Sequence, residues 1–459
     1  MPVAETVETI RMTNVLRCSR RRKPAHDQET DMWMTELDKT ERRTMAGCFL
    51  GWTLDALDVQ VYSFVIPTLL ISWHITAAEA GVLGTVTLLA SAIGGWLSGL
   101  AADRFGRVAV LQATILWYAI FTFASGFTQN YEQLFICRAL QGFGFGGEWA
   151  AGAVLIGETV RGVYRGRAVG IVQSGWAVGW GLAALLFGLF FSTMPEHLAW
   201  RALFWIGLAP ALLVFWVRRH VPESGVFTKG RRERPNRGML RQLLAIFRTD
   251  YLATTLRVSA LATGSIGGSY TFLIWLPTYL KTTRGLSVIG TTGYTTVMIV
   301  GAFVGFILGA YLADSIGRKR TFMLSAIGSA VILGAYMLMP ISNRAMLVLG
   351  FPLGLCAFMM FSPMGPYMTE LFPTRIRAAG QGFCYNFGRG IGALFPALVG
   401  KLTSVIGLGN AIAAFGIAAY AVMFLAVLLL PETLGRPLPD DVEPSQQPEG
   451  GAAKSYTPS

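Results

Sequence analysis

Apolar stretches of about 20 residues recur along the whole chain, separated by short segments that carry charge, glycine or proline. A helix of this length crosses the ~30 Å hydrocarbon core of a bilayer, because each residue adds about 1.5 Å of rise. Only 14% of the residues are charged, against about 25% in a typical soluble protein. The positive mean hydropathy of +0.50 also indicates an unusually apolar chain. We therefore expect an all-α protein that crosses a lipid bilayer many times.

The apolar stretches predict twelve membrane spans, six on each side of a polar central segment. They cover about 46–71, 81–101, 108–127, 133–157, 167–192 and 199–217, then 252–280, 291–313, 321–340, 345–368, 378–400 and 409–430. We accordingly divide the chain into an N-terminal tail (1–44), a six-helix bundle (45–218), a central loop (219–250), a second six-helix bundle (251–431) and a C-terminal tail (432–459). The N-terminal tail lacks the apolar core of a signal peptide, and Met32 and Met34 are alternative start positions.

Positive charge is distributed unevenly between the two sides of the predicted membrane. With the N-terminus inside, the outer loops hold five of the 38 Lys and Arg residues, three lie within spans, and the other 30 lie on the inner side. Such an excess marks the cytoplasmic side. We expect a multi-pass inner-membrane protein with both termini cytoplasmic, working as a monomer. The net charge of +12 is explained by these basic residues on the inner side, so we expect no nucleic-acid partner.

The two predicted bundles share a sequence repeat. Three residues of GLAADRFGRV recur 211 positions later in AYLADSIGRKR, and VPES at 221–224 is matched by LPET at 430–433. The recurring residues are Asp103, Gly106 and Arg107 in the first copy and Asp314, Gly317 and Arg318 in the second. Duplicated six-helix units typically form two pseudo-symmetric bundles with a binding site between them near the midplane.

These motifs, in this order, resemble those of the major facilitator superfamily over about residues 46–435. The supporting motifs are the loop motif after spans two and eight, RALQGFGFGGEW beginning at Arg138, Pro-Glu-Ser after span six, ELFPTRIRAAGQG from Glu370 to Gly382, and Pro-Glu-Thr at 431–433. Within the superfamily, LDALD and GFCYNFGRGIGALFPALVG are most similar to the proton symporters for sialate, lactate-like and aromatic acids. The resemblance implies secondary transport by alternating access, with protons as the coupling ion and no cofactor.

The resemblance also implies a conformational gate at the inner helix ends. Glycines there let helices approach closely, and an aspartate can cap a helix N-terminus or pair with an arginine, holding the halves in one state. The alternative is that these charges only orient the inner loops. The predicted gate residues are Gly99, Asp103, Arg104, Gly106, Arg107, Glu158, Asp314, Gly317, Arg318, Glu370, Arg375 and Arg377.

Few ionisable residues lie within the predicted spans, and each costs roughly 2.5–3.5 kcal/mol at a helix centre. Such residues are therefore functional candidates. They are Asp55, Asp58, Arg138, Glu148, Arg257 and Arg389. Arg257 lies near the inner end of its span, where its side chain can reach the interface.

Arg389 is the predicted ligand of a substrate carboxylate, because a guanidinium offers a planar fork to two oxygens and keeps its charge. The alternative is a structural arginine bound to helix carbonyls. Further predicted substrate contacts are Asn386, Tyr385, Gln173, Tyr270 and Trp275, each of which could equally pack between helices or face lipid.

Asp55 or Asp58 is the predicted proton carrier, with Glu148 as second choice and Arg138 as a partner. Burial and a nearby arginine act on a carboxyl in opposite directions, so a binding event can switch its protonation. A permanent pair of Asp58 with Arg138, holding two helices together, is the alternative. The four histidines fall in tails or loops and are not expected to relay protons.

The favoured function is proton-coupled symport of a small organic anion: a monocarboxylate, sialate or an aromatic acid. Proton-coupled drug export is less favoured because the fifth span lacks a Gly-Pro pair. A neutral-sugar porter would leave Arg389 without a purpose, and a non-transporting membrane sensor would need larger tails. No nucleophile with a base, metal-ligand cluster or phosphate loop is present in the sequence, so we expect neither an enzyme nor a metal site.

Overall fold

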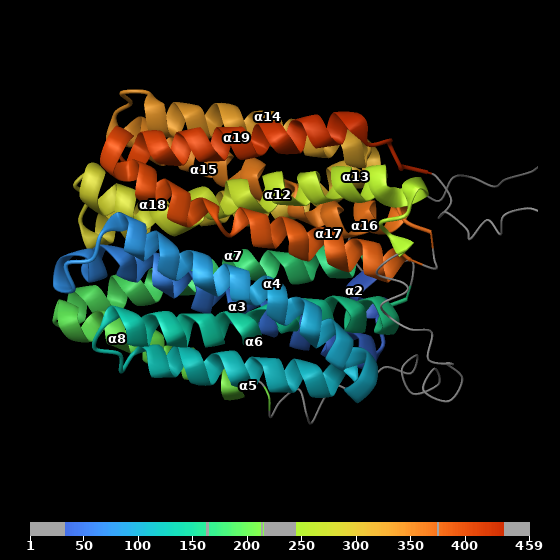
Figure 1. The fold of residues 1–459 in the computed structure, drawn as a ribbon, viewed down its shortest axis with the longest axis horizontal. Helices are drawn as coiled ribbons and strands as arrows, with labels where there is room; N and C mark the ends of the chain where they lie inside the picture. The colour runs from blue at the N-terminus through green and yellow to red at the C-terminus, as the bar shows by residue number, and fades with distance from the viewer. Residues whose placement is uncertain (1–32, 162–164, 213, 215–244, 374–375, 436–459) are drawn as a thin grey trace, which may run out of the picture.

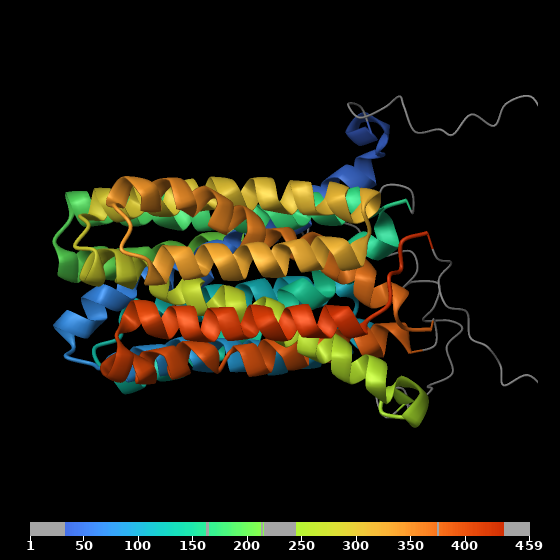
Figure 2. The ribbon, with the colours of Figure 1, turned by 90° about the horizontal axis from the view of Figure 1, so that it is seen from above.

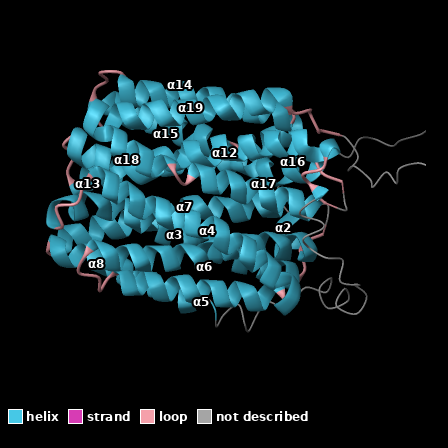
Figure 3. Cartoon of the chain, in the orientation of Figure 1, coloured by secondary structure: helices cyan, strands magenta, loops and turns pink. Residues whose placement is uncertain are grey.

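The computed structural model describes residues 33–161, 165–212, 214, 245–373 and 376–435. Regular structure in these ranges is helical (Figure 3). The helices run side by side along one long axis in two perpendicular views (Figures 1 and 2). The first described helix, α2 (Trp33–Glu36), lies at the same end of the bundle as the end of the last, α19 (Leu408–Leu429) (Figure 1). We call this the terminal end and the opposite one the far end.

The first half of the bundle consists of six successive segments. They are α3 (Lys39–Ser72), α4 (Ala77–Phe105), α5 (Arg107–Ser125), α6 (Tyr131–Thr159), α7 (Arg165–Thr193) and α8 (Glu196–Trp205), which continues as a 3₁₀ turn (Ile206–Leu208). Helix α6 packs between α4 and α5, and α3 packs along α7. Helix α3 begins earlier than the predicted span, because Asp38 caps it and forms a capping box with Glu41.

The second half also has six segments, two of which are broken. They are α12 (Thr249–Thr278) with a π-helical end (Tyr279–Thr283), α13 (Val288–Ser315), α14 (Arg318–Leu338), the pair α15 (Asn343–Met359) and α16 (Phe361–Glu370), the pair α17 (Arg377–Gly392) and α18 (Phe395–Ile406), and α19. Pro396 begins α18, and proline has no N–H to continue the hydrogen bonding of α17. The sequence predicted one unbroken span for each pair.

Nine helices or helix pairs in the described part are long and apolar enough to cross a membrane. The other three predicted spans coincide with α6, α12 and the partly described α8. The predicted all-α fold with twelve spans is therefore confirmed. Most of the predicted central loop and most of each predicted tail lie outside the described residues. The VPES motif at 221–224 lies outside them too.

The repeated loop motif adopts the same backbone conformation in both halves. Gly106, between α4 and α5, has φ 107° and ψ 152°, and Gly317, before α14, has φ 106° and ψ 158°. A positive φ of this size strains any residue with a Cβ. Both halves thus need glycine at the same turn, which supports their origin by duplication.

Contacts between the halves follow the same symmetry. Helix α7 of the first half packs against α13 of the second, α4 packs against α17 and α18, and α3 contacts α12. These helices surround the long axis where the two halves meet.

Close packing of α4 on α6 depends on small residues. A Cβ at Gly146 would collide with the backbone oxygen of Ser91, and one at Gly142 with that of Thr87. We expect Gly146→Ala to lower stability by about 1–3 kcal/mol, because a backbone oxygen cannot move aside as a side chain can. Thermal unfolding in detergent measures this change. Gly293→Ala in α13, where no atom lies within 4 Å of the added Cβ, is the matched control. Equal shifts for both variants would contradict the packing explanation.

Candidate functional site

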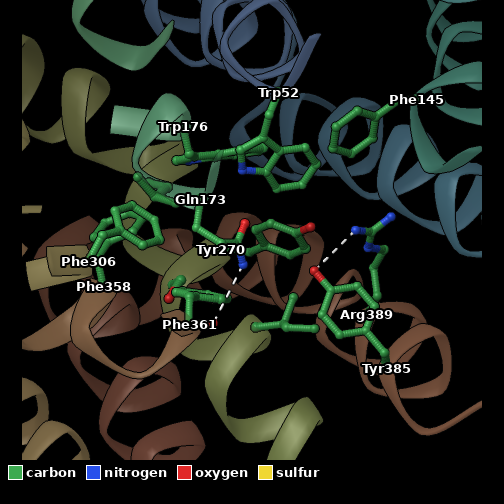
Figure 4. Close-up of a pocket in the computed structure, with 13 residues that line it drawn as sticks. Trp52, Phe145, Gln173, Trp176, Tyr270, Phe306, Phe358, Phe361, Tyr385 and Arg389 are labelled. Carbon is green, nitrogen blue, oxygen red and sulfur yellow. Dashed lines mark hydrogen bonds between the residues drawn. The ribbon is translucent and has the colours of Figure 1, made fainter. Parts of the chain in front are cut away.

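A pocket lies between the two halves and is lined by side chains from both (Figure 4). It holds ≈ 450 Å³ of space free of protein atoms, part of which opens to solvent. The first half contributes Trp52, Phe145, Gln173 and Trp176, and the second contributes Ile266, Ser269, Tyr270, Leu273, Phe306, Phe358, Phe361, Tyr385 and Arg389.

Arg389 is buried at one side of this pocket, with 1% of its surface exposed (Figure 4). Its Nη2 donates a hydrogen bond to the Tyr385 hydroxyl at 3.3 Å, one helical turn away. Its guanidinium carbon lies 5.0 Å from the Tyr385 ring centroid and 5.4 Å from that of Phe145. Its Nε and Nη1 have no hydrogen-bond partner among the described residues. A buried cation with unused donors is the expected binding site for an anion.

Asp55 is the acid that the structure brings near this cation. It is fully buried on α3 and interacts electrostatically with Arg389, which lies on α17 of the other half. An anion that binds Arg389 therefore enters the field of a carboxyl from the opposite half.

Asp58 and Arg138 are joined through a third residue. Arg138 Nη1 donates to Gln141 Oε1 at 2.6 Å, and Gln141 Nε2 donates to the Asp58 carboxylate. None of the ion pairs between described residues joins Asp58 directly to Arg138. The Arg138 guanidinium lies over the ring of Tyr62, 4.5 Å from its centroid. Gln141 was not predicted, although it lies one turn after Arg138 on α6.

Four of the six predicted substrate contacts line the pocket: Arg389, Tyr385, Gln173 and Tyr270. The other two do not. Asn386 donates to the carbonyl of Gly382, and Trp275 is fully buried and donates to the carbonyl of Pro396 at 3.1 Å. The side chain of Glu148 lies outside the described part of the structure.

Gln173 links the halves at the pocket. Its Nε2 lies 3.5 Å from the carbonyl oxygen of Phe361, where α16 begins after the break in the tenth span. Its Oε1 has no hydrogen-bond partner among the described residues. The amide is thus placed to bind both a ligand and the other half of the protein.

The sequence did not single out most of the aromatic lining. The additional residues are Trp52, Phe145, Phe306, Phe358 and Phe361. Trp52 lies three residues before Asp55, and Phe145 lies seven after Arg138, so helical spacing from these polar candidates points to both. No comparable signal in the sequence marks the three phenylalanines of the second half.

The halves are joined at the far end. Glu196 accepts hydrogen bonds from Lys281 at 2.8 Å and from Thr68 at 3.0 Å, and the backbone N–H of Ala397 donates to Thr85 at 3.2 Å. The Lys281 hydrogen bond holds the pKa of Glu196 below its usual range. These contacts hold the two halves together toward the far end.

The halves are less closely packed toward the terminal end. Asn386 still touches α4, because a Cβ at Gly95 would lie 2.9 Å from its amide oxygen. One turn further on each helix, Gly99 of α4 and Gly382 of α17 have no atom within 4 Å of an added Cβ. The pocket is therefore more open on this side.

A charged cluster occupies the terminal end of the second half. Arg318 donates to Asp314 at 2.8 Å and to Glu370 at 3.2 Å, and Thr433 donates to the second oxygen of Glu370. Glu432 accepts the backbone N–H groups of residues 318 and 319 at 3.0 and 3.1 Å, at the N-terminus of α14. Burial opposes its ionisation, but the backbone N–H groups of residues 434 and 433, together with those of residues 318 and 319, hold the pKa of Glu432 below its usual range.

This cluster brings together the predicted gate residues Asp314, Arg318 and Glu370 beside Gly317. Arg377 lies nearby and donates to the carbonyls of residues 369 and 372. All described members of the cluster belong to the second half, so their contacts stabilise that half and do not join it to the first. In the first half, Arg104 is exposed and contacts only the neighbouring Phe105 ring in the described structure. Outside the described part lie Arg375 and the side chains of Asp103, Arg107 and Glu158.

The chain is similar in sequence to a known protein family and to named transport proteins. The family described as Major Facilitator Superfamily matches residues 48–395 and, in a second match, 294–456. A probable 4-methylmuconolactone transporter of Cupriavidus pinatubonensis is 41% identical over 403 residues, covering 88% of this chain and 93% of its own. The cis,cis-muconate transport protein of Acinetobacter baylyi is 31% identical over 391 residues, covering 84% and 93%.

A solved structure shares the arrangement of helices. The proton:xylose symporter XylE bound to 6-bromo-6-deoxy-D-glucose has a TM-score of 0.68 and 19% identity, over 87% of this chain and 98% of its own. At this identity the match shows a common fold.

Proposed function

This chain belongs to the major facilitator superfamily of membrane transporters, as its motifs predicted, and on that premise we propose that it carries a small organic anion across the membrane together with protons. Superfamily membership makes it a transporter and not an enzyme. Our choice of an organic anion as the substrate is based on the residues that line the pocket.

The observation that carries this proposal is the buried Arg389 guanidinium with two N–H donors unused among the described residues. A carboxylate fits a guanidinium fork and neutralises its charge, whereas a neutral sugar leaves the buried charge uncompensated. Relatives named for transport of 4-methylmuconolactone and cis,cis-muconate support an organic acid as the substrate.

Proton coupling follows from charge balance at the same pocket. Asp55 interacts with Arg389 before an anion arrives. An entering carboxylate adds a second negative charge near one cation, which favours a proton on the aspartate. The bound site then carries no extra charge when the halves rock between their two states. Asp58, connected to Arg138 through Gln141, is the second candidate carrier.

Orientation follows from the positively charged loops. We place the terminal end in the cytoplasm and the protein in the inner membrane, with both termini inside and the monomer as the working unit. No cofactor is needed besides the coupling proton.

Uptake into proteoliposomes tests this proposal. A labelled panel of monocarboxylates, sialate and hydroxylated aromatic acids is supplied with and without an inward proton gradient. We expect at least one acid to accumulate only with the gradient and to leak out after a protonophore is added. Equal accumulation without a gradient would contradict proton coupling. Movement of neutral sugars and of no acid would contradict the choice of substrate.

A further inference from the structure

We infer that the pocket selects flat, unsaturated monocarboxylates, and that it discriminates against dicarboxylates and against heavily hydroxylated acids such as sialate. The inference rests on the proposed function, because it assumes that a carboxylate binds Arg389. It narrows the substrate to one class by the charge, shape and hydrogen-bonding capacity of the lining.

The first argument is charge. Arg389 is the only Lys, Arg, His, Asp or Glu among the described residues that line the pocket. The side of the pocket away from Arg389 is lined by Phe306, Phe358 and Phe361 (Figure 4). A second carboxylate on a ligand bound to Arg389 would lose its water against phenyl rings and find no cation in return. One carboxylate per substrate is therefore favoured, so this chain should differ in selectivity from its 31% identical relative named for cis,cis-muconate, which carries two carboxylates.

The second argument is shape. Trp52 and Trp176 of the first half lie with ring centroids 5.0 Å apart, and Phe358 lies 5.3 Å from Phe306 and 5.8 Å from Phe361 in the second half. In Figure 4 the two indoles lie on one side of Tyr270 and Phe361 on the other. Rings from both halves thus offer faces and edges to a flat ligand, which stacks on them better than a puckered ring does.

The third argument is hydrogen bonding. Apart from Arg389, the polar groups of the described lining are the side chains of Gln173, Ser269, Tyr270 and Tyr385 and the indole N–H donors of Trp52 and Trp176. They are few for a pocket in which most of the lining is apolar or aromatic. Ser269 donates to the carbonyl of residue 265, and Tyr385 accepts from Arg389. A ligand with many hydroxyl groups would leave most of them without partners, each at a cost comparable to a lost hydrogen bond. The Gln173 Oε1 can accept one hydroxyl, which permits a single ring substituent.

Calorimetric binding to the purified protein in detergent tests the inference without any gradient. 4-Methylbenzoate and terephthalate differ by a second carboxylate, and benzoate and cyclohexanecarboxylate differ in flatness. We expect terephthalate and sialate to bind at least about tenfold more weakly than 4-methylbenzoate. We expect cyclohexanecarboxylate to bind about threefold to tenfold more weakly than benzoate, the range for lost stacking.

The outcomes separate this inference from the proposed function. If Arg389→Gln abolishes binding of both 4-methylbenzoate and terephthalate, but the wild type binds them equally, the selection for one charge is wrong and carboxylate binding stands. If the wild type binds none of the acids, the proposed function fails. If cyclohexanecarboxylate binds as well as benzoate, the argument from shape is wrong.

A designed variant provides an independent test. Gln173→Lys adds a cation to the lining, and it should raise the affinity for terephthalate relative to 4-methylbenzoate by about tenfold or more. Gln173→Met, of similar size and without charge, is the matched control and should not raise this ratio. An unchanged ratio in Gln173→Lys, in protein that elutes as a single species, would contradict the argument from charge.

Discussion

Arg389→Gln is expected to weaken binding of the transported acid by about 30-fold or more and to abolish its uptake at micromolar concentrations. The guanidinium is 1% exposed, and its unused Nε and Nη1 donors point to a ligand carboxylate. Loss of one partner of such a buried charge pair costs about 2–5 kcal/mol. Calorimetric titration and proteoliposome uptake measure the two effects.

Two further variants control for fold and for charge. Arg257→Gln removes an arginine from α12 whose side chain is exposed in the structure, so its uptake should stay close to wild type. Arg389→Lys keeps the charge and loses the planar fork, so its uptake should lie between that of the wild type and that of Arg389→Gln. Normal uptake by Arg389→Gln would contradict the carboxylate site, whatever the other variants do.

Hydropathy and motif spacing predicted the number of helices and their order well, because a membrane span needs a long apolar stretch. The ends were less predictable. Helix α3 extends back to Lys39 through charged residues, where a local capping box decides the boundary. The break before α18 lies at Pro396, a signal that the division into apolar stretches overlooked. Apolar composition did not mark the break before α16 either.

Arg389 could be predicted because a buried charge is rare and costly in a membrane span. Tyr385 and Gln173 were plausible because their side chains can form hydrogen bonds with an anion or a hydroxyl group. Trp275 shows the limit of such reasoning. It lies one turn beyond Tyr270 on α12, but it donates to Pro396 and packs against α18. An aromatic residue in an apolar helix carries no mark that distinguishes pocket, lipid and helix contacts.

The gate was predicted in part. Asp314, Arg318 and Glu370 lie together as expected, but the described cluster lies within one half. Polar contacts that join the halves lie instead toward the far end, between Glu196 and Lys281 and between Thr85 and Ala397, and at the pocket, between Gln173 and Phe361. These residues belong to no repeated motif, so only the folded arrangement shows that they meet.

Asp55→Asn, or Asp58→Asn if the second candidate is the carrier, is expected to abolish accumulation driven by a proton gradient while it preserves exchange of internal for external substrate. If one proton moves with each anion, a gradient of two pH units supports about 100-fold accumulation in the wild type. Accumulation in the variant that lacks the carrier should fall to about the external concentration. Counterflow of labelled substrate, which needs no gradient, checks that the variants still move substrate.

Substrate affinity at one fixed pH then distinguishes the two aspartates. Asp55 interacts electrostatically with Arg389 and competes with the substrate for its charge, so Asp55→Asn should bind the substrate more tightly than the wild type. Asp58→Asn should bind it with wild-type affinity, because Asp58 contacts Gln141 and does not line the pocket. Full accumulation in both variants would exclude these aspartates as carriers and leave Glu148 as the next acid to test.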